Sequence, residues 1–157
     1  MIILEEDNLS NVDKAKIIFT EILEKRDFSW IDKIFSEFYG IREGKDNEAD
    51  FQNKKGTGKL GVRLYLNTFV QAFDQTKYTF LNIIENDNQV VIRWKIQAKH
   101  VQDIFSIKAT NKQINVIGVT WVFFDKQNLI RNIYLIWNGF SLMDQLDLEL
   151  VSKDKNR

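Results

Sequence analysis

Residues 89–100, QVVIRWKIQAKH, alternate between apolar and polar side chains along their whole length. Successive side chains of an extended strand point to opposite faces. One face therefore carries four apolar side chains, those of Ile92, Trp94, Ile96 and Ala98. The same face ends in His100, the only histidine of the chain. The pattern predicts a long, half-buried β-strand that directs His100 towards the apolar side.

Two hairpin turns are predicted around this strand. Asn86-Asp87-Asn88 separates it from a strand over residues 78–85, and Asp125-Lys126-Gln127-Asn128 joins strands over residues 114–124 and 129–137. Asn and Asp tolerate the left-handed backbone angles that tight turns require. We therefore expect an antiparallel sheet in the C-terminal half.

The N-terminal half carries helical patterns. Ser10 and Asp13 have the spacing of a capping box, and apolar residues follow at intervals of three and four: Val12, Ala15, Phe19 and Ile22. A second, short buried helix is predicted from the apolar residues between 28 and 38, and a third after Gly58. Helices followed by strands favour an α+β fold with the helices on one side of an antiparallel sheet.

Composition narrows the classes of function. The 157 residues suit a single domain spanning 1–157, and Lys+Arg equal Asp+Glu at 22 each. A net charge of zero gives no long-range attraction to nucleic acid or to an anionic membrane, so we expect neither partner. The chain has no cysteine, which excludes disulfides and, with one histidine, disfavours a zinc site.

The N-terminus gives no sign of export. Residues 1–7 lack a basic segment, and their apolar run is too short for a signal peptide. No stretch of the chain approaches the length of a membrane span. We therefore expect a cytoplasmic protein.

The last two predicted hairpin strands are apolar on both faces, which has a consequence for assembly. A sheet of this kind must cover both faces, and the helices can cover one. A second copy of the chain is the economical cover for the other, because wide apolar patches are unusual on monomers. We therefore expect a homodimer formed through the outer sheet face.

Four further stretches of the sequence are informative: Phe69–Asp74, Gln89–Trp94 with Lys99-His100, Ala109–Lys112, and Ile130–Asn138 with Gln145-Leu146. They resemble segments of the SnoaL-like polyketide cyclase (ester cyclase) family of the nuclear transport factor 2-like superfamily. The family's counterparts are, in order, the helix end Ala-Phe-Pro-Asp, whose proline is missing here, the strand Val-x-x-Arg-Trp closing in Thr-His, the turn Pro-Thr-Gly-Lys, and the strand Ile-x-x-x-Trp-x-x-x-Asp followed by Gln-Leu-Gly. The resemblance runs from about residue 56 to 146 and implies a cone-like, curved antiparallel sheet packed on N-terminal helices.

The same resemblance implies a chemistry. Cyclases of this family close a ring by an intramolecular aldol reaction without a cofactor, and an acidic residue removes a proton next to a carbonyl. The resemblance places that residue at Asn138. An amide can hydrogen-bond to a ligand oxygen but cannot accept its proton, so the family's acid/base position is disarmed unless another group substitutes.

Seven residues are candidates for the site, each with a structural alternative. His100 could be the replacement base, because an imidazole titrates near neutral pH, or a buried histidine satisfied by a neighbour. Asn138 and Asn132 could orient a ligand oxygen or close the sheet's own hydrogen bonds. Aromatic residues could stack on a ligand or close the pocket, or form the core: Tyr134, Trp94, Tyr39 and Phe69.

The sequence leaves two functions open. In the first, the chain binds a small apolar or aromatic molecule with a carbonyl or hydroxyl group, and any enzymatic activity is cofactor-independent cyclase or isomerase chemistry. His100 would then be the acid/base and Asn138 the oxygen-binding donor. In the second, the chain is a non-enzymatic ligand carrier, or a dimerisation module whose pocket is filled by its own side chains.

Overall fold

The computed structural model describes residues 8–42 and 58–149, with residues 38–42 described by their backbone alone. These described residues form four α-helices, one π-helical segment and five strands. In order they are α1 (Asn11–Ile17), η2 (Ile18–Glu24), α2 (Trp30–Ile34), β1 (Phe35–Arg42), α3 (Gly58–Ala72), β2 (Phe73–Asn86), β3 (Gln89–His100), β4 (Gln113–Phe124), β5 (Ile130–Trp137) and α4 (Gly139–Gln145).

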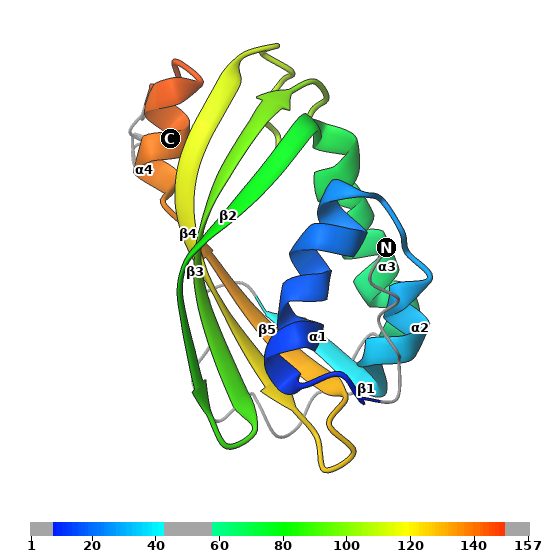
Figure 1. Cartoon of the computed structure of the whole chain (residues 1–157). Coiled ribbons are helices and arrows are strands. Elements are labelled where there is room, and N and C mark those ends of the chain that lie inside the picture. The colour runs from blue at the N-terminus through cyan, green and yellow to red at the C-terminus, as the bar shows by residue number, and fades with distance from the viewer. Residues whose placement is uncertain (1–7, 43–57, 150–157) are drawn as a thin grey trace, which may run out of the picture.

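The strands form one curved sheet in the order β1-β5-β4-β3-β2. The helices α1, α2 and α3 lie on its concave side, whereas α4 lies beside β4, away from them (Figure 1). The predicted α+β fold, a curved sheet packed on N-terminal helices, is therefore confirmed. None of the described helices is long and apolar enough to cross a membrane.

The first strand corrects the expected topology, because the sheet is mixed and not wholly antiparallel. The predicted second helix ends at Ile34, and the chain continues as β1, which pairs with β5 in parallel. Without β1, the outer edge of β5 would leave a row of backbone N–H and C=O groups unpaired. Satisfying this edge outweighs the helical spacing of the apolar residues after Ile34.

Both predicted hairpin turns are present. Asp87 and Asn128 adopt left-handed backbone angles, with φ of 48° and 57°. The Asp125 carboxylate also accepts hydrogen bonds from the backbone N–H groups of Gln127 and Leu129, at 2.9 and 3.0 Å. These short polar side chains therefore stabilise the two chain reversals that the sequence predicts.

The first helical segment begins as predicted and then changes its winding. Ser10 Oγ accepts from the Asp13 N–H at 3.1 Å, and an Asp13 carboxylate oxygen accepts from the Ser10 N–H at 3.0 Å, which completes the capping box. From Ile18 onward the chain is π-helical, a rare geometry that often occurs at functional sites. This segment still buries its apolar side, including Phe19 and Ile22.

The core lies between the helices and the concave faces of β3 and β4. The burial of β3 alternates as predicted, and the side chains from Ile92 to His100 on its inner face are buried. Trp94 lies at the centre, where its indole Nε1–H donates to Thr120 Oγ1 at 2.9 Å. A large ring can be buried at this point because its polar atom has a partner on the neighbouring strand.

Candidate functional site

An apolar pocket lies on the concave side of the sheet, between η2, α3 and the inner faces of β4 and β5. The empty space in this pocket, including the open solvent at its mouth, amounts to about 400 Å³. Its lining is mostly aliphatic and aromatic and includes Phe19, Leu23, Tyr65, Phe69, Leu135 and Trp137. A wall of this kind is suited to apolar ligands.

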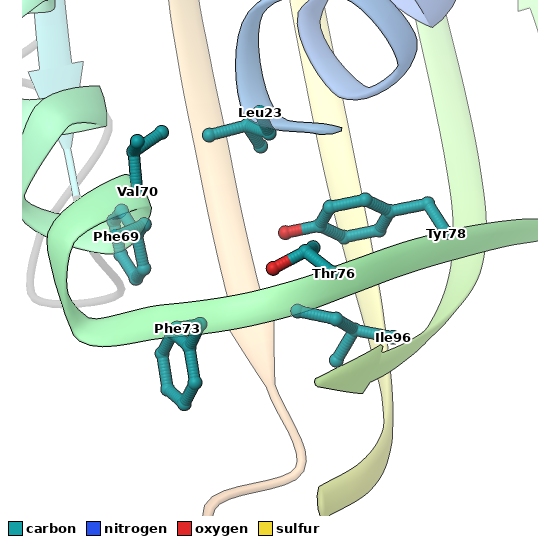
Figure 2. Close-up of a pocket in the computed structure, with 7 residues that line it drawn as sticks. All are labelled: Leu23, Phe69, Val70, Phe73, Thr76, Tyr78 and Ile96. Atoms are coloured by element: carbon teal, nitrogen blue, oxygen red, sulfur yellow. The ribbon is translucent and has the colours of Figure 1, made fainter. Parts of the chain in front are cut away.

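A second, smaller pocket of about 180 Å³ adjoins the first at the start of β2 (Figure 2). Leu23, Phe69 and Tyr78 line both pockets. Thr76, beside a shift in the β2–β3 register between Asp74 and Lys77, adds a hydroxyl to the smaller one. These three shared side chains form the partition between the two spaces.

Aromatic rings occupy much of the concave interior. Trp137 stacks on Phe69 with ring centroids 5.7 Å apart and meets Trp94 edge-on at 5.1 Å. The space that a water-sized sphere can enter is small in both pockets. A bicyclic ligand therefore requires some lining rings to rotate, and part of the interior predicted to be hollow is filled by the protein's own side chains.

Tyr78 supplies a polar group inside this apolar environment. Its side chain is only 8% exposed, and its hydroxyl points inward among the labelled side chains in Figure 2. Burial and then the nearby charge of Glu24 raise the pKa of Tyr78 above its ordinary value, so the phenol stays protonated. Among the described lining residues, neither pocket has a carboxylate or an imidazole.

Glu24, the last residue of η2, holds the backbone of Tyr78. One carboxylate oxygen accepts a hydrogen bond from the Tyr78 N–H at 2.5 Å, and the other lies 3.4 Å from Lys77 Nζ. The Glu24 side chain is 14% exposed, whereas that of Lys77 is 70% exposed. The sequence analysis missed both Glu24 and Tyr78. An acid directly after a buried helical face and a tyrosine that opens an alternating strand were the available signals.

His100 is fully buried, as its parity predicts. Its Nδ1 lies 3.0 Å from Thr110 Oγ1, and its ring packs 5.5 Å from that of Phe73. The other nitrogen, Nε2, is buried with no hydrogen-bond partner in the described part of the chain. His100 does not line either pocket described above, and its proposed catalytic role stays a prediction.

Two predicted site residues of β5 lie on the other face of the sheet, where Asn132 is nevertheless buried and its Oδ1 has no hydrogen-bond partner in the described part of the chain. Tyr134 opposes Trp121 and Asn132 opposes Phe123, and directly opposed residues share a face. The exposed Asn138 caps α4, where its Oδ1 accepts from the Ser141 N–H at 3.1 Å. The facing that strand parity predicts for Tyr134 and Asn132 is therefore corrected, and the ligand-binding role of these residues and of Asn138 stays a prediction.

A shift in register explains this correction. Between Phe123 and Phe124 the β4–β5 ladder gains one residue, since their partners are Asn132 and Ile130. Such a bulge reverses the parity of the strand beyond it, so Ile130 faces the core while Tyr134 does not. Leu135 and Trp137 face the pocket in their place.

The remaining candidate site residues lie in different parts of the structure. Phe69 lines both pockets, and Trp94 lies in the core next to the Trp137 ring. The backbone of Tyr39 belongs to β1, but its side chain lies outside the described residues. Within residues 8–42 and 58–149, no group of three or more acidic or histidine side chains is arranged to hold a metal ion.

Comparison with solved structures places this architecture among polyketide cyclase-like folds. TsrD from Streptomyces laurentii has 16% sequence identity and a TM-score of 0.70, with 88% of this chain and 98% of that chain covered. A provisionally assigned SnoaL-like polyketide cyclase from a Jannaschia species has 10% identity and a TM-score of 0.74, with coverages of 89% and 93%. A provisionally assigned polyketide cyclase from Acidithiobacillus ferrooxidans has 24% identity and a TM-score of 0.68, with coverages of 88% and 98%.

These identities are low, so the three structures establish the shared fold alone. A search of curated proteins finds no match. The model of the SnoaL-like polyketide cyclase family, however, matches residues 18–146, which include η2, α3 and the strands that line the pocket. The chain belongs to the SnoaL-like polyketide cyclase family.

Proposed function

We propose that this chain binds a small, largely apolar molecule carrying a carbonyl or hydroxyl group in the pocket between η2, α3 and the inner face of the sheet. The observation that carries the proposal is the apolar lining of that pocket around a buried tyrosine hydroxyl. Membership of a family named for polyketide cyclases supports it. A pocket with few polar groups binds by removing apolar surface from water.

The expected affinity is modest. Burying roughly 250 Å² of apolar ligand surface at about 25 cal/mol per Å² contributes about 6 kcal/mol before the costs of ordering. Rotation of the stacked Phe69 and Trp137 rings lowers this gain further. We therefore expect dissociation constants in the roughly millimolar to micromolar range for a bicyclic ketone.

Binding of 2-acetylnaphthalene, followed by calorimetry and ligand-observed NMR, tests the proposal. Leu135→Phe adds bulk to the pocket wall, whereas Ile136→Phe adds similar bulk to the exposed outer face. The expected result is binding to the wild type and to Ile136→Phe, with at least tenfold weaker binding to Leu135→Phe. Failure of the wild type to bind at millimolar ligand, or equal binding by both variants, would remove this pocket as the site.

Proton-transfer chemistry of the cyclase or isomerase kind is a second candidate, favoured by the unpartnered Nε2 of buried His100. His100 does not line either pocket but packs against Phe73, which lines the smaller one, so this chemistry requires the Phe73 ring to move aside. A base of this kind would accelerate exchange of the methyl protons next to the carbonyl of 2-acetylnaphthalene in heavy water. We expect His100→Gln to abolish exchange with little change in melting temperature. Absence of exchange in the wild type, or exchange that survives while stability falls, assigns His100 a structural role.

The outer sheet face supports self-association as a homodimer. Apolar side chains of β4 and β5 form an outer patch: Ile117, Val119, Trp121, Phe123, Tyr134 and Ile136. Trp121 and Ile136 are 42% and 56% exposed. Apolar patches of this kind mark interaction sites. Arg93 and Lys95 of β3 oppose Val119 and Ile117 and so border the patch, and a second copy must leave these two charges at the solvated rim of the interface.

Sedimentation at micromolar concentration tests this assembly. Trp121→Lys combined with Ile136→Lys should convert a wild-type dimer to a monomer, because each copy would then bury unpaired charges. Leu60→Lys is the matched control, since Leu60 is 68% exposed on α3, on the helical side of the molecule. A monomeric wild type would refute the homodimer.

A further inference from the structure

The hydroxyl of Tyr78 faces the pockets and forms no hydrogen bond with the described part of the chain. Its ring is held edge-on by Phe19 at 5.0 Å and by Trp94 at 5.5 Å. Among the described residues, none forms a hydrogen bond with the hydroxyl, although its backbone N–H is bonded to Glu24. Buried tyrosine hydroxyls usually have a partner, because losing water without replacement costs free energy.

The position of this donor is set by two rigid elements. The π-helical segment η2 ends at Glu24, whose carboxylate fixes the Tyr78 N–H, and it contributes Leu23 and Phe19 to the surroundings of the ring. The register shift in β2 just before Lys77 brings the strand to this contact. A donor fixed at both backbone and ring is preorganised, so binding a ligand oxygen costs little ordering.

A second hydroxyl lines the same pocket. Thr120 Oγ1 accepts the indole Nε1–H of Trp94 at 2.9 Å, which leaves its own proton free to be donated. The indole Nε1–H of Trp137 also lines this pocket and is buried with no hydrogen-bond partner in the described part of the chain. All three groups are therefore neutral donors in an apolar wall. A carbonyl oxygen fits this wall, whereas a carboxylate or an ammonium group would lose its hydration without a compensating opposite charge.

We propose that the Tyr78 hydroxyl donates a hydrogen bond to the carbonyl oxygen of a neutral, apolar ketone, at the partition between the two pockets. This inference rests on the proposed ligand-binding function and names the group that the ligand must carry. The Tyr78 hydroxyl makes binding selective for a ligand that carries a carbonyl group. The apolar lining supplies the remaining affinity whether or not the ligand carries that group.

Four dissociation constants test the assignment. They are those of the wild type and Tyr78→Phe with 2-acetylnaphthalene and with 2-ethylnaphthalene, two probes that match in shape and differ in the carbonyl. The wild type should prefer the ketone by about tenfold, and Tyr78→Phe should reduce this preference to near unity. Binding of the hydrocarbon should be unchanged, and Tyr134→Phe on the outer face should retain the wild-type preference.

Two further measurements distinguish loss of the hydrogen bond from loss of folding in Tyr78→Phe. The carbonyl stretch of the bound ketone should lie at lower frequency in the wild type than in Tyr78→Phe, as expected for a bond that the hydroxyl polarises. Tyr78→Phe should also fold at least as stably as the wild type at neutral pH, because the hydroxyl that it removes forms no hydrogen bond with the described part of the chain. If the ratio of the dissociation constants for the two probes is the same in both proteins, this inference fails, while the proposed binding of apolar ligands is retained. If the wild type binds neither probe, the proposed function itself fails.

Discussion

The indole of Trp94 lies directly over Gly118 on the neighbouring strand. A Cβ atom built on Gly118 would meet the Cη2 and Cζ2 atoms of that ring at 2.3 Å and the backbone oxygen of Ile136 at 2.8 Å. Trp94 is fully buried and tethered by its bond to Thr120. The largest side chain of the core is therefore accommodated because β4 has no side chain at this point.

Gly118→Ala should destabilise the protein strongly. The ring cannot move without breaking its hydrogen bond, and the Ile136 oxygen belongs to the β5 backbone, so we expect a loss of about 3 kcal/mol. Gly139→Ala is the control, because a Cβ there has no atom within 4 Å. Urea denaturation measures both changes. Similar stabilities of the two variants would contradict the close packing of Trp94 on Gly118.

The sequence predicts this part of the fold well because the period of β3 is unbroken. Every inner position from Ile92 to His100 is buried, and the facing residues of β4 alternate in the same phase. Because side chains alternate with a period of two, the faces of β3 can be assigned without knowing which strand pairs with it. Burial of Trp94 and His100 could therefore be read directly from residues 89–100.

The face of β5 could not be predicted in the same way. Extending one parity from Ile130 places Tyr134 and Asn138 inward, but the bulge near Arg131 reverses that parity. Both sets of side chains on β5 are mostly apolar, so hydrophobicity does not identify the inner face. The parallel strand β1 was missed for a related reason, since its pairing depends on a free edge of β5 that is distant in sequence.

Glu24 should contribute to stability through its contact with Tyr78. Glu24→Ala leaves the Tyr78 N–H without its acceptor in a partly buried place, and we expect a loss of about 1–3 kcal/mol. Glu24→Gln retains an acceptor oxygen and should lose less. Glu85→Ala on the exposed end of β2 should change the free energy of unfolding by under about 0.5 kcal/mol. Equal losses for Glu24→Ala and Glu85→Ala would show that the contact contributes nothing.

Alkaline pH should reveal the environment of Tyr78. Its pKa is raised in the folded state and ordinary, about 10, in the unfolded state, so above that pH the unfolded chain binds fewer protons. The stability that Tyr78 contributes is present below about pH 10 and is lost as pH rises towards the folded pKa. The slope reaches at most about 1.4 kcal/mol per pH unit.

Tyr78→Phe should therefore lose less stability than the wild type between about pH 9 and 11. Urea denaturation across this range measures the difference, and the shared titration of lysines and other tyrosines cancels between the two proteins. Tyr134→Phe on the outer face should follow the wild-type curve. Parallel pH profiles for Tyr78→Phe and the wild type would show that the hydroxyl is not withdrawn from water.

Asn138 should act as a helix cap and not as a ligand-binding group. Asn138→Ala removes the acceptor for the Ser141 N–H at the start of α4, and we expect a loss of about 1 kcal/mol. Asn138→Asp keeps an acceptor and introduces the acid that the sequence resemblance implies for this position. It should nevertheless leave both stability and the affinity for 2-acetylnaphthalene near the wild-type values. Because Asn138 is exposed while Leu135 lines the pocket, Leu135→Phe is the positive control for lost binding. A gain of methyl-proton exchange in Asn138→Asp would instead show that this position reaches the ligand.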